Sequence, residues 1–189
     1  MNHKGTISLE SEILLLRRFV AGDSVTMFRN LYSDAEAMRF LPWETHLSIE
    51  QTEAHLAGYV SGYAHPEFYA WAIVPKSQNE PVGFIDTSID YAINAVKVDY
   101  GIGKPWWYKG YASSALFLLI HFFFEEVGVN RIYATHDPRN PNSGKVMEKC
   151  GMKYEGTLRR TRFRKGEYSD RAMYAIIAED FFSLRMDRP

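Results

Sequence analysis

The spacing of apolar residues divides the chain into strands and helices. Short runs that alternate or stay apolar, bounded by Pro, Gly or Asn, predict β-strands, whereas apolar residues three or four apart predict helices. Strand patterns occupy 13–19, 68–74, 82–90, 95–102, 131–136, 154–164 and 169–177. Only turns separate the three strands between 68 and 102, so we expect an antiparallel meander there. The last two strands are expected to form a hairpin across 165–167.

Helix signals lie between these strands. One helix is expected after a cap at Asp23 or Ser24, and another begins at Ser48, where Gln51 completes the pattern of a capping box. Gly128 is expected to end the longest helix as a left-handed C-cap. The remaining helix patterns occupy 34–40, 110–127, 143–150 and 179–186.

The order of these elements predicts one α/β (α+β) domain. The length of 189 residues suits a single core, and we find neither an internal repeat nor a linker rich in Pro, Gly or Ser. The strand, helix and strand over 95–136 indicate a mixed sheet. We therefore expect one domain over 1–189, with a mixed, mostly antiparallel sheet of about seven strands flanked by helices. The first ~10 residues are polar and could form a flexible leader.

Composition and charge narrow the class of protein. The formal net charge is -1, and without a block of basic residues a nucleic-acid partner is disfavoured. The single cysteine, Cys150, cannot form an internal disulfide, which favours a reducing compartment. The longest apolar run, 115–124, is too short to span a bilayer, and 1–11 has no signal-peptide pattern. We expect a cytoplasmic protein without a membrane partner.

The segment 103–114 is the first candidate binding site. A strand ends there, turn residues follow, and a helix begins at once, so free backbone N–H groups would point at one spot. Gly110, Ala112 and Ser113 are small enough to let a phosphate approach. An ordinary strand-to-helix connection is the alternative interpretation, since it also favours glycine. Neither a P-loop nor a G-x-G-x-x-G dinucleotide motif is present.

Two segments carry a resemblance to a known family. The run 107–112 (WYKGYA) resembles the Q/R-x-x-G-x-G/A acetyl-coenzyme A loop of the GNAT superfamily, in the form typical of its ribosomal-protein N-terminal acetyltransferase branch. The run 140–152 resembles that branch's N-x-x-S-x-x-v-x-e-K-x-G-f segment, and 13–19, 154–159 and 170–174 resemble further strands. Tyr108 departs from the family's usual first glycine, and Ser114 from its usual glutamate.

The resemblance implies acetyl-coenzyme A as cosubstrate, without a metal. It implies a V-shaped opening between the fourth and fifth predicted strands, 95–102 and 131–136, through which the pantetheine arm passes. Lys145 or Lys149 would meet the outer phosphate, although both could equally form a solvated helix face. The residues implied to bind the coenzyme are Tyr100, Gly101, Ile102, Trp107, Tyr108, Lys109, Gly110, Tyr111, Ala112, Ser113, Asn140, Ser143 and Lys145.

Four residues are candidates for proton transfer. Ser143 matches the family serine beside the thiol, but it could equally cap a helix that starts there. His136 ends a strand near the expected site, where it could relay a proton or simply be hydrogen-bonded. Some relatives have a catalytic Glu where this chain has Lys97, and Asp99 lies two residues on, on the same strand face. Glu44 is the last candidate. Cys150 matches an apolar family position and is expected to pack in the core rather than react.

The acceptor side is expected to come from the early helices and the neighbouring strand. Its candidate residues are Phe40, Trp43, Glu44 and Tyr69. Aromatic walls with an acidic residue suit a cationic amine or a peptide N-terminus, although such aromatics could instead be core, as we expect for Trp71.

The function expected from these observations is transfer of acetyl from acetyl-coenzyme A to a protein or peptide N-terminus. A small amine such as a polyamine, amino acid or aminoglycoside is the alternative acceptor. A non-catalytic acyl-coenzyme A sensor is the alternative of another class, and a homodimer is an expected state of assembly.

Overall fold

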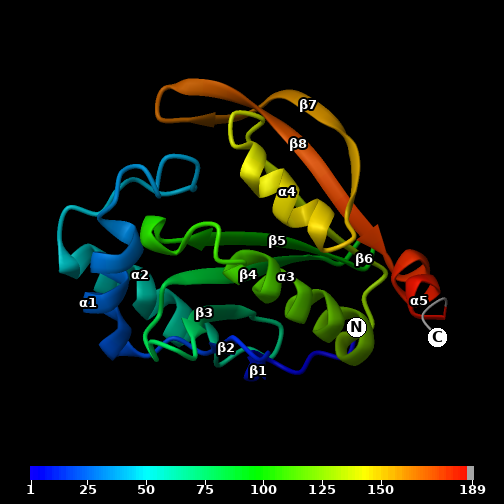
Figure 1. Cartoon of the computed structure of the whole chain (residues 1–189), viewed down its shortest axis with the longest axis horizontal. Coiled ribbons are helices and arrows are strands. Elements are labelled where there is room, and N and C mark those ends of the chain that lie inside the picture. The colour runs from blue at the N-terminus through cyan, green and yellow to red at the C-terminus, as the bar shows by residue number, and fades with distance from the viewer. Residues whose placement is uncertain (187–189) are drawn as a thin grey trace.

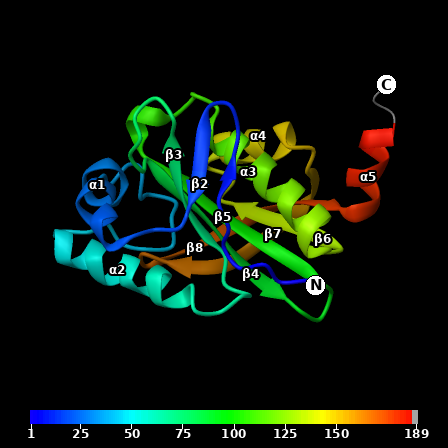
Figure 2. The same cartoon turned by 90° about the horizontal axis from the view of Figure 1, so that it is seen from below.

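A computed structural model describes residues 1–186 as one open sheet covered by helices on both faces (Figures 1 and 2). The sheet has eight strands in the order β1-β2-β3-β4-β5-β6-β8-β7. The strands are β1 (Leu9–Glu10), β2 (Leu14–Arg17), β3 (Ala70–Pro75), β4 (Gly83–Asp90), β5 (Ala95–Ile102), β6 (Arg131–His136), β7 (Lys153–Arg164) and β8 (Glu167–Ile177). The helices are α1 (Ser24–Met27), α2 (Ile49–Gly62), α3 (Tyr111–Phe122), α4 (Pro141–Lys149) and α5 (Ala178–Met186). The predicted fold class is confirmed, and the strand that the sequence did not predict is the two-residue β1.

The one parallel pair among the described strands creates the opening in the sheet. β5 and β6 are paired from Ala95 with Arg131 to Val98 with Ala134, and there their pairing stops. Beyond this point β5 continues beside β4, while β6 continues beside β8. Figure 1 shows β7 and β8 rising away from β5, with α4 between them. The strands therefore part in a V, as the family resemblance implied.

Two cores lie on opposite faces of the sheet. Alternate residues of β3 point to each side, so that Trp71 and Ile73 pack with α3, whereas Ala70 and Ala72 pack with α1 and α2. This period of two explains why the strand is buried on both faces. Within residues 1–186, no helix combines the length and the apolar run that crossing a membrane requires.

The prediction of a helix over 34–40 is wrong, because this segment forms a succession of turns. The carboxylate of Asp34 accepts the backbone N–H groups of Glu36 and Ala37, at 2.8 and 3.2 Å. A side chain that captures nearby backbone donors in this way offers the chain an alternative to a helical ladder. The resulting irregular turn brings Arg39 and Phe40 to the mouth of the V.

Helix boundaries differ from the sequence pattern at two further places. α4 begins at Pro141 rather than 143, because proline suits the first helical position, where no N–H is needed. α2 follows Ser48 as predicted, but the serine makes no cap bond, and Gln51 instead accepts the N–H of Leu47 at 2.6 Å. The long helix continues through a π-turn over Phe123–Val127 and ends at a left-handed Gly128, as predicted.

The first ten residues, expected as a leader, run along the sheet and make specific contacts. The N–H of Asn2 donates to the carbonyl of Val127 at 2.7 Å, and Gly5 donates to Pro66 at 2.9 Å. The buried hydroxyl of Thr6 donates to the carbonyl of Phe68 at 2.9 Å. β1 then pairs with β2 at the sheet edge.

Candidate active site

The turn after β5 is shaped by close contacts that only small residues allow. A Cβ atom at Gly103 would lie 1.9 Å from the carbonyl oxygen of Asn30, so a side chain has no space there. The indole N–H of Trp107 donates to the carbonyl of Ile102 at 2.8 Å, which folds the loop back on the strand end. Gly110 then adopts φ +79° as the N-cap of α3, a left-handed conformation that favours glycine.

The start of α3 fits an anionic group. The first backbone N–H groups of a helix have no partner inside the helix, and Gly110 has no side chain that could cap them. A Cβ at Gly110 would meet nothing within 4 Å, so the space above it is open. Lys145 and Lys149 of α4 line the same cleft, and neither forms an ion pair within residues 1–186. Backbone donors and free cations on two walls suit the diphosphate of a coenzyme.

One cleft of about 490 Å³ connects this helix start with the V between the strands. The turn segment 36–41, the end of β5, the loop 106–113 and the first turns of α4 form its walls. Lys109 is exposed and does not line it. The other predicted coenzyme residues all line it, namely Tyr100, Gly101, Ile102, Trp107, Tyr108, Gly110, Tyr111, Ala112, Ser113, Asn140, Ser143 and Lys145. Their contacts with a coenzyme stay a prediction.

Two hydroxyl groups meet where the strands part. The hydroxyl of Tyr100 donates to the carbonyl of Ser143 at 2.9 Å and lies 3.0 Å from its Oγ. Burial raises the pKa of Tyr100 well above its usual value. Ser143 is not the helix cap that the sequence suggested, because α4 already starts at Pro141 and Asn140 holds the cap position. The Tyr100 side chain was not singled out from sequence, since the hydroxyl contact joins residues 43 positions apart.

The acidic candidates are both engaged with lysines. Asp99 and Lys97 share one face of β5, as the strand period predicts, and their side chains form an ion pair. Asp99 lines a smaller hollow beside Tyr100 and Ser143. The Glu44 carboxylate is 77% exposed, lies 3.8 Å from the Lys165 ammonium, and lines none of the hollows described here. Neither carboxylate is thus a free base at the opening.

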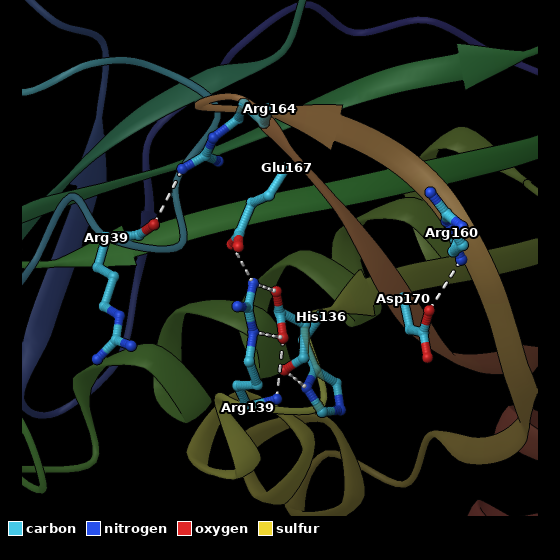
Figure 3. Close-up of polar contacts among 8 residues, drawn as sticks. Arg39, His136, Arg139, Arg160, Arg164, Glu167 and Asp170 are labelled. Atoms are coloured by element: carbon cyan, nitrogen blue, oxygen red, sulfur yellow. Dashed lines mark hydrogen bonds and ion pairs between the residues drawn. The ribbon is translucent and has the colours of Figure 1, made fainter.

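His136 lies beneath α4 and lines the same smaller hollow. Its Nδ1 is 2.8 Å from the carbonyl of Asp137, and because a carbonyl only accepts, Nδ1 carries the proton. Nε2 faces the helix, where a Cβ at Gly144 would stand 2.8 Å away (Figure 3). The ring is therefore clamped between β6 and α4, and its part in proton transfer stays a prediction.

Of the predicted acceptor residues, Tyr69 belongs to the core and Trp43 is partly buried against it. Tyr69 is 1% exposed, and its hydroxyl accepts the N–H of Lys4 at 3.1 Å. Trp43 packs edge-on against Phe84 and His55, with ring centroids 5.2 and 4.6 Å apart. Neither residue lines the hollows described here. Aromatic patterns do not distinguish a core from a cleft wall, and the part of both residues in binding the acceptor stays a prediction. Phe40 does line the cleft, and Trp71 is a core residue as expected.

Cys150 is a packing residue, as the sequence suggested. Its thiol is buried and lies 3.3 Å from the carbonyl of Ser113 on the neighbouring helix. Burial raises the pKa of the Cys150 thiol to about 12, so it stays protonated at neutral pH. Within residues 1–186, no group of three His, Cys, Asp or Glu side chains is placed to hold a metal ion.

Sequence reasoning missed the residues on the far side of the V. Arginines of the β7–β8 hairpin and of the turn 35–42 line two small hollows that adjoin the coenzyme cleft. Arg162 and Arg164 lie two apart on β7 and therefore share a strand face, which the printed sequence does reveal. Arg171 of β8 and Arg39 of the turn join them only through the tertiary fold.

Comparisons with known proteins identify the family. The profile of the acetyltransferase (GNAT) domain matches residues 14–153. A crystal structure of a GNAT-family acetyltransferase from Bacillus anthracis superposes with a TM-score of 0.81, at 26% identity, covering 92% of this chain and 99% of that one. With the V-shaped opening and the helix start described above, these findings show that the chain belongs to the GNAT family and is an N-acetyltransferase.

Curated relatives cover nearly the same length. The uncharacterized N-acetyltransferase YoaA of Bacillus subtilis is 26% identical over 170 residues, 89% of this chain and 96% of the relative. The [ribosomal protein uS5]-alanine N-acetyltransferase of Escherichia coli is 24% identical over 155 residues, 78% of this chain and 80% of the relative. The similarity to the ribosomal-protein branch, first indicated by the two motifs, is confirmed at low identity.

Proposed function

We propose that this enzyme transfers acetyl from acetyl-coenzyme A to the α-amine of a protein or peptide N-terminus. GNAT enzymes use acetyl-coenzyme A, whose thioester supplies the acetyl group. The α3 start at Gly110 would hold the diphosphate, and Lys145 or Lys149 the outer phosphate. The end of β5 and Asn140 would hold the pantetheine arm, because they line the V through which it must pass.

The Asp99–Lys97 ion pair is the observation that carries the choice of amine. The attacking amine must be neutral, and an α-amine titrates near ~7.8 whereas a lysine side chain titrates near ~10.4. Generating neutral lysine at pH 7 therefore costs about 3.5 kcal/mol more. A site whose acidic groups are already paired with lysines suits the α-amine, because this amine needs less assistance from a general base to become neutral.

Tyr100 and Ser143 are the groups best placed to return a proton to the leaving thiolate. Their hydroxyls lie 3.0 Å apart at the point where β5 and β6 separate, and both line the coenzyme cleft and the adjoining hollow. The raised pKa keeps the Tyr100 hydroxyl protonated, so it can donate a hydrogen bond that stabilises the negative charge of the leaving thiolate. The pair also fixes β5 to α4 across the opening.

The relatives support a protein acceptor, since one of them is an alanine N-acetyltransferase for ribosomal protein uS5. A polyamine or aminoglycoside is disfavoured because arginines line the far side of the V, where a polycation would be repelled.

The proposal is tested with peptide pairs and mass spectrometry. One peptide has a free N-terminus and no lysine, and its partner has a blocked N-terminus and one internal lysine. We expect acetylation of the free α-amine at least about a hundredfold faster at pH 7.5. Preferential acetylation of the lysine, or of small amines alone, would contradict the proposal.

A further inference from the structure

The hollow on the acceptor side holds more positive charge than its own carboxylates neutralise. Six cations line it, while Asp137 and Glu167 are its only carboxylates within residues 1–186. The cations are Arg39, Arg139, Arg162, Arg164, Lys165 and Arg171. Two opposite charges against six leave a local surplus, although the whole chain carries a formal charge of -1.

A single arginine occupies both carboxylates (Figure 3). Arg139 donates from Nε and Nη2 to Asp137, at 3.0 and 2.7 Å, and from Nη2 to Glu167 at 2.9 Å. This arrangement joins the loop after β6 to the start of β8. The other arginines of the hollow are left without an acidic partner in the described part of the chain.

Arg171 is the most unusual of these cations because it is only 9% exposed. It donates to the backbone carbonyl of Thr135 at 3.0 Å and to the Thr135 hydroxyl at 3.2 Å, and both acceptors are neutral. Arginines are almost never this buried unless a charge pairs with them. Burial and the nearby Arg162 lower the pKa of Arg171, and the carboxylates of Asp99 and Asp137 offset this only in part.

Arg162 and Arg164 extend this positive surface along β7. Arg164 donates to the backbone carbonyl of Arg39 at 3.0 Å, which closes the hairpin onto the turn (Figure 3). Burial and Arg162 lower the pKa of Arg164 as well. Arg162 pairs with Ser169 in the sheet, whereas its guanidinium forms no hydrogen bond or ion pair within residues 1–186 and lines the hollow.

The position of these arginines connects them to the reaction. Arg162 and Arg171 line the hollow that also contains Tyr100 and Ser143, so a group bound to them shares one space with the reacting amine. The two hollows measure only about 40 and 50 Å³. Since a hollow of ~10–15 Å³ by this measure holds one water, each of them has room for a small group such as a carboxylate. Arginine presents paired donors that match a carboxylate.

We propose that the acceptor is an acidic peptide N-terminus, whose side-chain carboxylate within its first few residues is bound by Arg162 and Arg171. This proposal rests on the proposed function, and it adds the chemistry of the residues that follow the acetylated amine. The carboxylate supplies the charge that the buried Arg171 lacks. Electrostatic attraction also brings such peptides to the open mouth of the V.

The test compares three peptides that differ only at positions two and three, where they carry Asp-Glu, Asn-Gln or Lys-Lys. For the native enzyme we expect kcat/KM for the acidic peptide to exceed that of the neutral one at least tenfold, with the lysine peptide slowest. Arg162→Gln should lower kcat/KM for the acidic peptide by the full acidic preference, at least tenfold, and should lower kcat/KM for the neutral peptide much less. Added NaCl should lower kcat/KM for the acidic peptide alone, because salt screens the attraction between its carboxylates and the arginines.

Arg160→Gln is the matched control, because Arg160 also lies on β7 but its guanidinium lies 4.6 Å from the ring centre of Tyr168, outside the hollows. This variant should leave kcat/KM unchanged for all three peptides. Equal rates for acidic and neutral peptides, or equal losses in both variants, would overturn the proposal. If only free acidic amino acids are acetylated, and this requires Arg162, the anion site stands while the peptide acceptor is overturned. Acetylation of neutral peptides without any acidic preference leaves the proposed function intact and removes this inference alone.

Discussion

The two halves of the cleft are built in different ways. The coenzyme half uses backbone groups of one continuous segment, 100–113, together with the first turns of α4. The acceptor half uses side chains that come from three distant segments, namely the turn 35–42, the loop after β6 and the β7–β8 hairpin. Backbone donors are the same whatever the residue, so we expect the proposed coenzyme half to tolerate Tyr108 and Ser114 in place of the family's usual residues.

Side chains form the proposed acceptor half. Changing one arginine would change the charge of the hollow, whereas a neutral substitution away from Gly110 would leave the backbone donors of the helix start in place. A fold that many enzymes share can therefore keep its donor while its acceptor varies. The following predictions test this division, beginning with the largest expected effect.

Gly110→Asp should nearly abolish coenzyme binding. The substitution adds a carboxylate where an anionic diphosphate is expected, at the N-cap of α3. We expect the KM for acetyl-coenzyme A to rise about a hundredfold, which corresponds to about 2.7 kcal/mol. Gly128→Asp is the control, since Gly128 has a similar φ of +76° but lies at the other end of the helix. Unchanged calorimetric binding in Gly110→Asp would remove the helix start from the coenzyme site.

Tyr100→Phe should slow the chemical step and leave coenzyme binding intact. The variant loses the hydroxyl that contacts Ser143 but keeps the ring in the cleft. We expect kcat to fall about tenfold, or about 1.4 kcal/mol, with the KM for acetyl-coenzyme A within twofold. Ser143→Ala should give a similar loss, and the double variant should lose little more, because the two hydroxyls act together. Additive losses would show that they act separately.

Asp86→Asn should stabilise the fold at alkaline pH. Asp86 of β4 accepts the hydroxyl of Tyr59 at 2.7 Å, and burial raises the pKa of this carboxyl to about 7. Between pH 4 and 7 the folded state holds a proton that the unfolded state has released, so native stability falls as pH rises. The gain of the variant should grow from near zero at pH 4 to about 1 kcal/mol or more at pH 8, because the Asp86 carboxyl must lose its proton in a mostly buried position.

Urea unfolding at several pH values measures this difference, with the acceptor hollow left untouched. His55 contributes the opposite pH dependence of stability, because burial lowers the pKa of His55 to about 4. This histidine makes stability rise with pH between about 4 and 6.5, opposite to Asp86. In Asp86→Asn, the free energy of unfolding should therefore rise with pH between about 4 and 6.5. A gain that is constant with pH would contradict the assignment.

Tyr108→Gly should have the smallest effect. Tyr108 adopts φ +62° where the family has glycine, and such a conformation costs a non-glycine residue about 1 kcal/mol. The variant loses the hydrogen bond from Asn142, which is 3.2 Å long and exposed. Glycine also raises the entropy of the unfolded chain, which offsets part of the relieved strain. We therefore expect a net stabilisation of about 0.5 kcal/mol or less. kcat/KM for acetyl-coenzyme A should stay within about threefold, and a larger loss would show that the Tyr108 ring acts on the coenzyme.

The sequence by itself determined the sheet, the long helix and the coenzyme loop. These features depend on local properties, namely strand and helix periods, the left-handed Gly110 and Gly128, and backbone donors at a helix start. The same locality explains why the order of motifs was sufficient to indicate the family.

Only the tertiary structure decided which side chains meet. Tyr69 is a core residue and Trp43 packs against the core because of how β3 and the turn pack, which no residue pattern specifies. Tyr100 contacts Ser143, and Arg164 reaches the carbonyl of Arg39, across 43 and 125 positions. Such contacts depend on strand register and on the angle at which β5 and β6 part. The order of residues along the chain does not specify the register or this angle, because both are set only when the whole core packs.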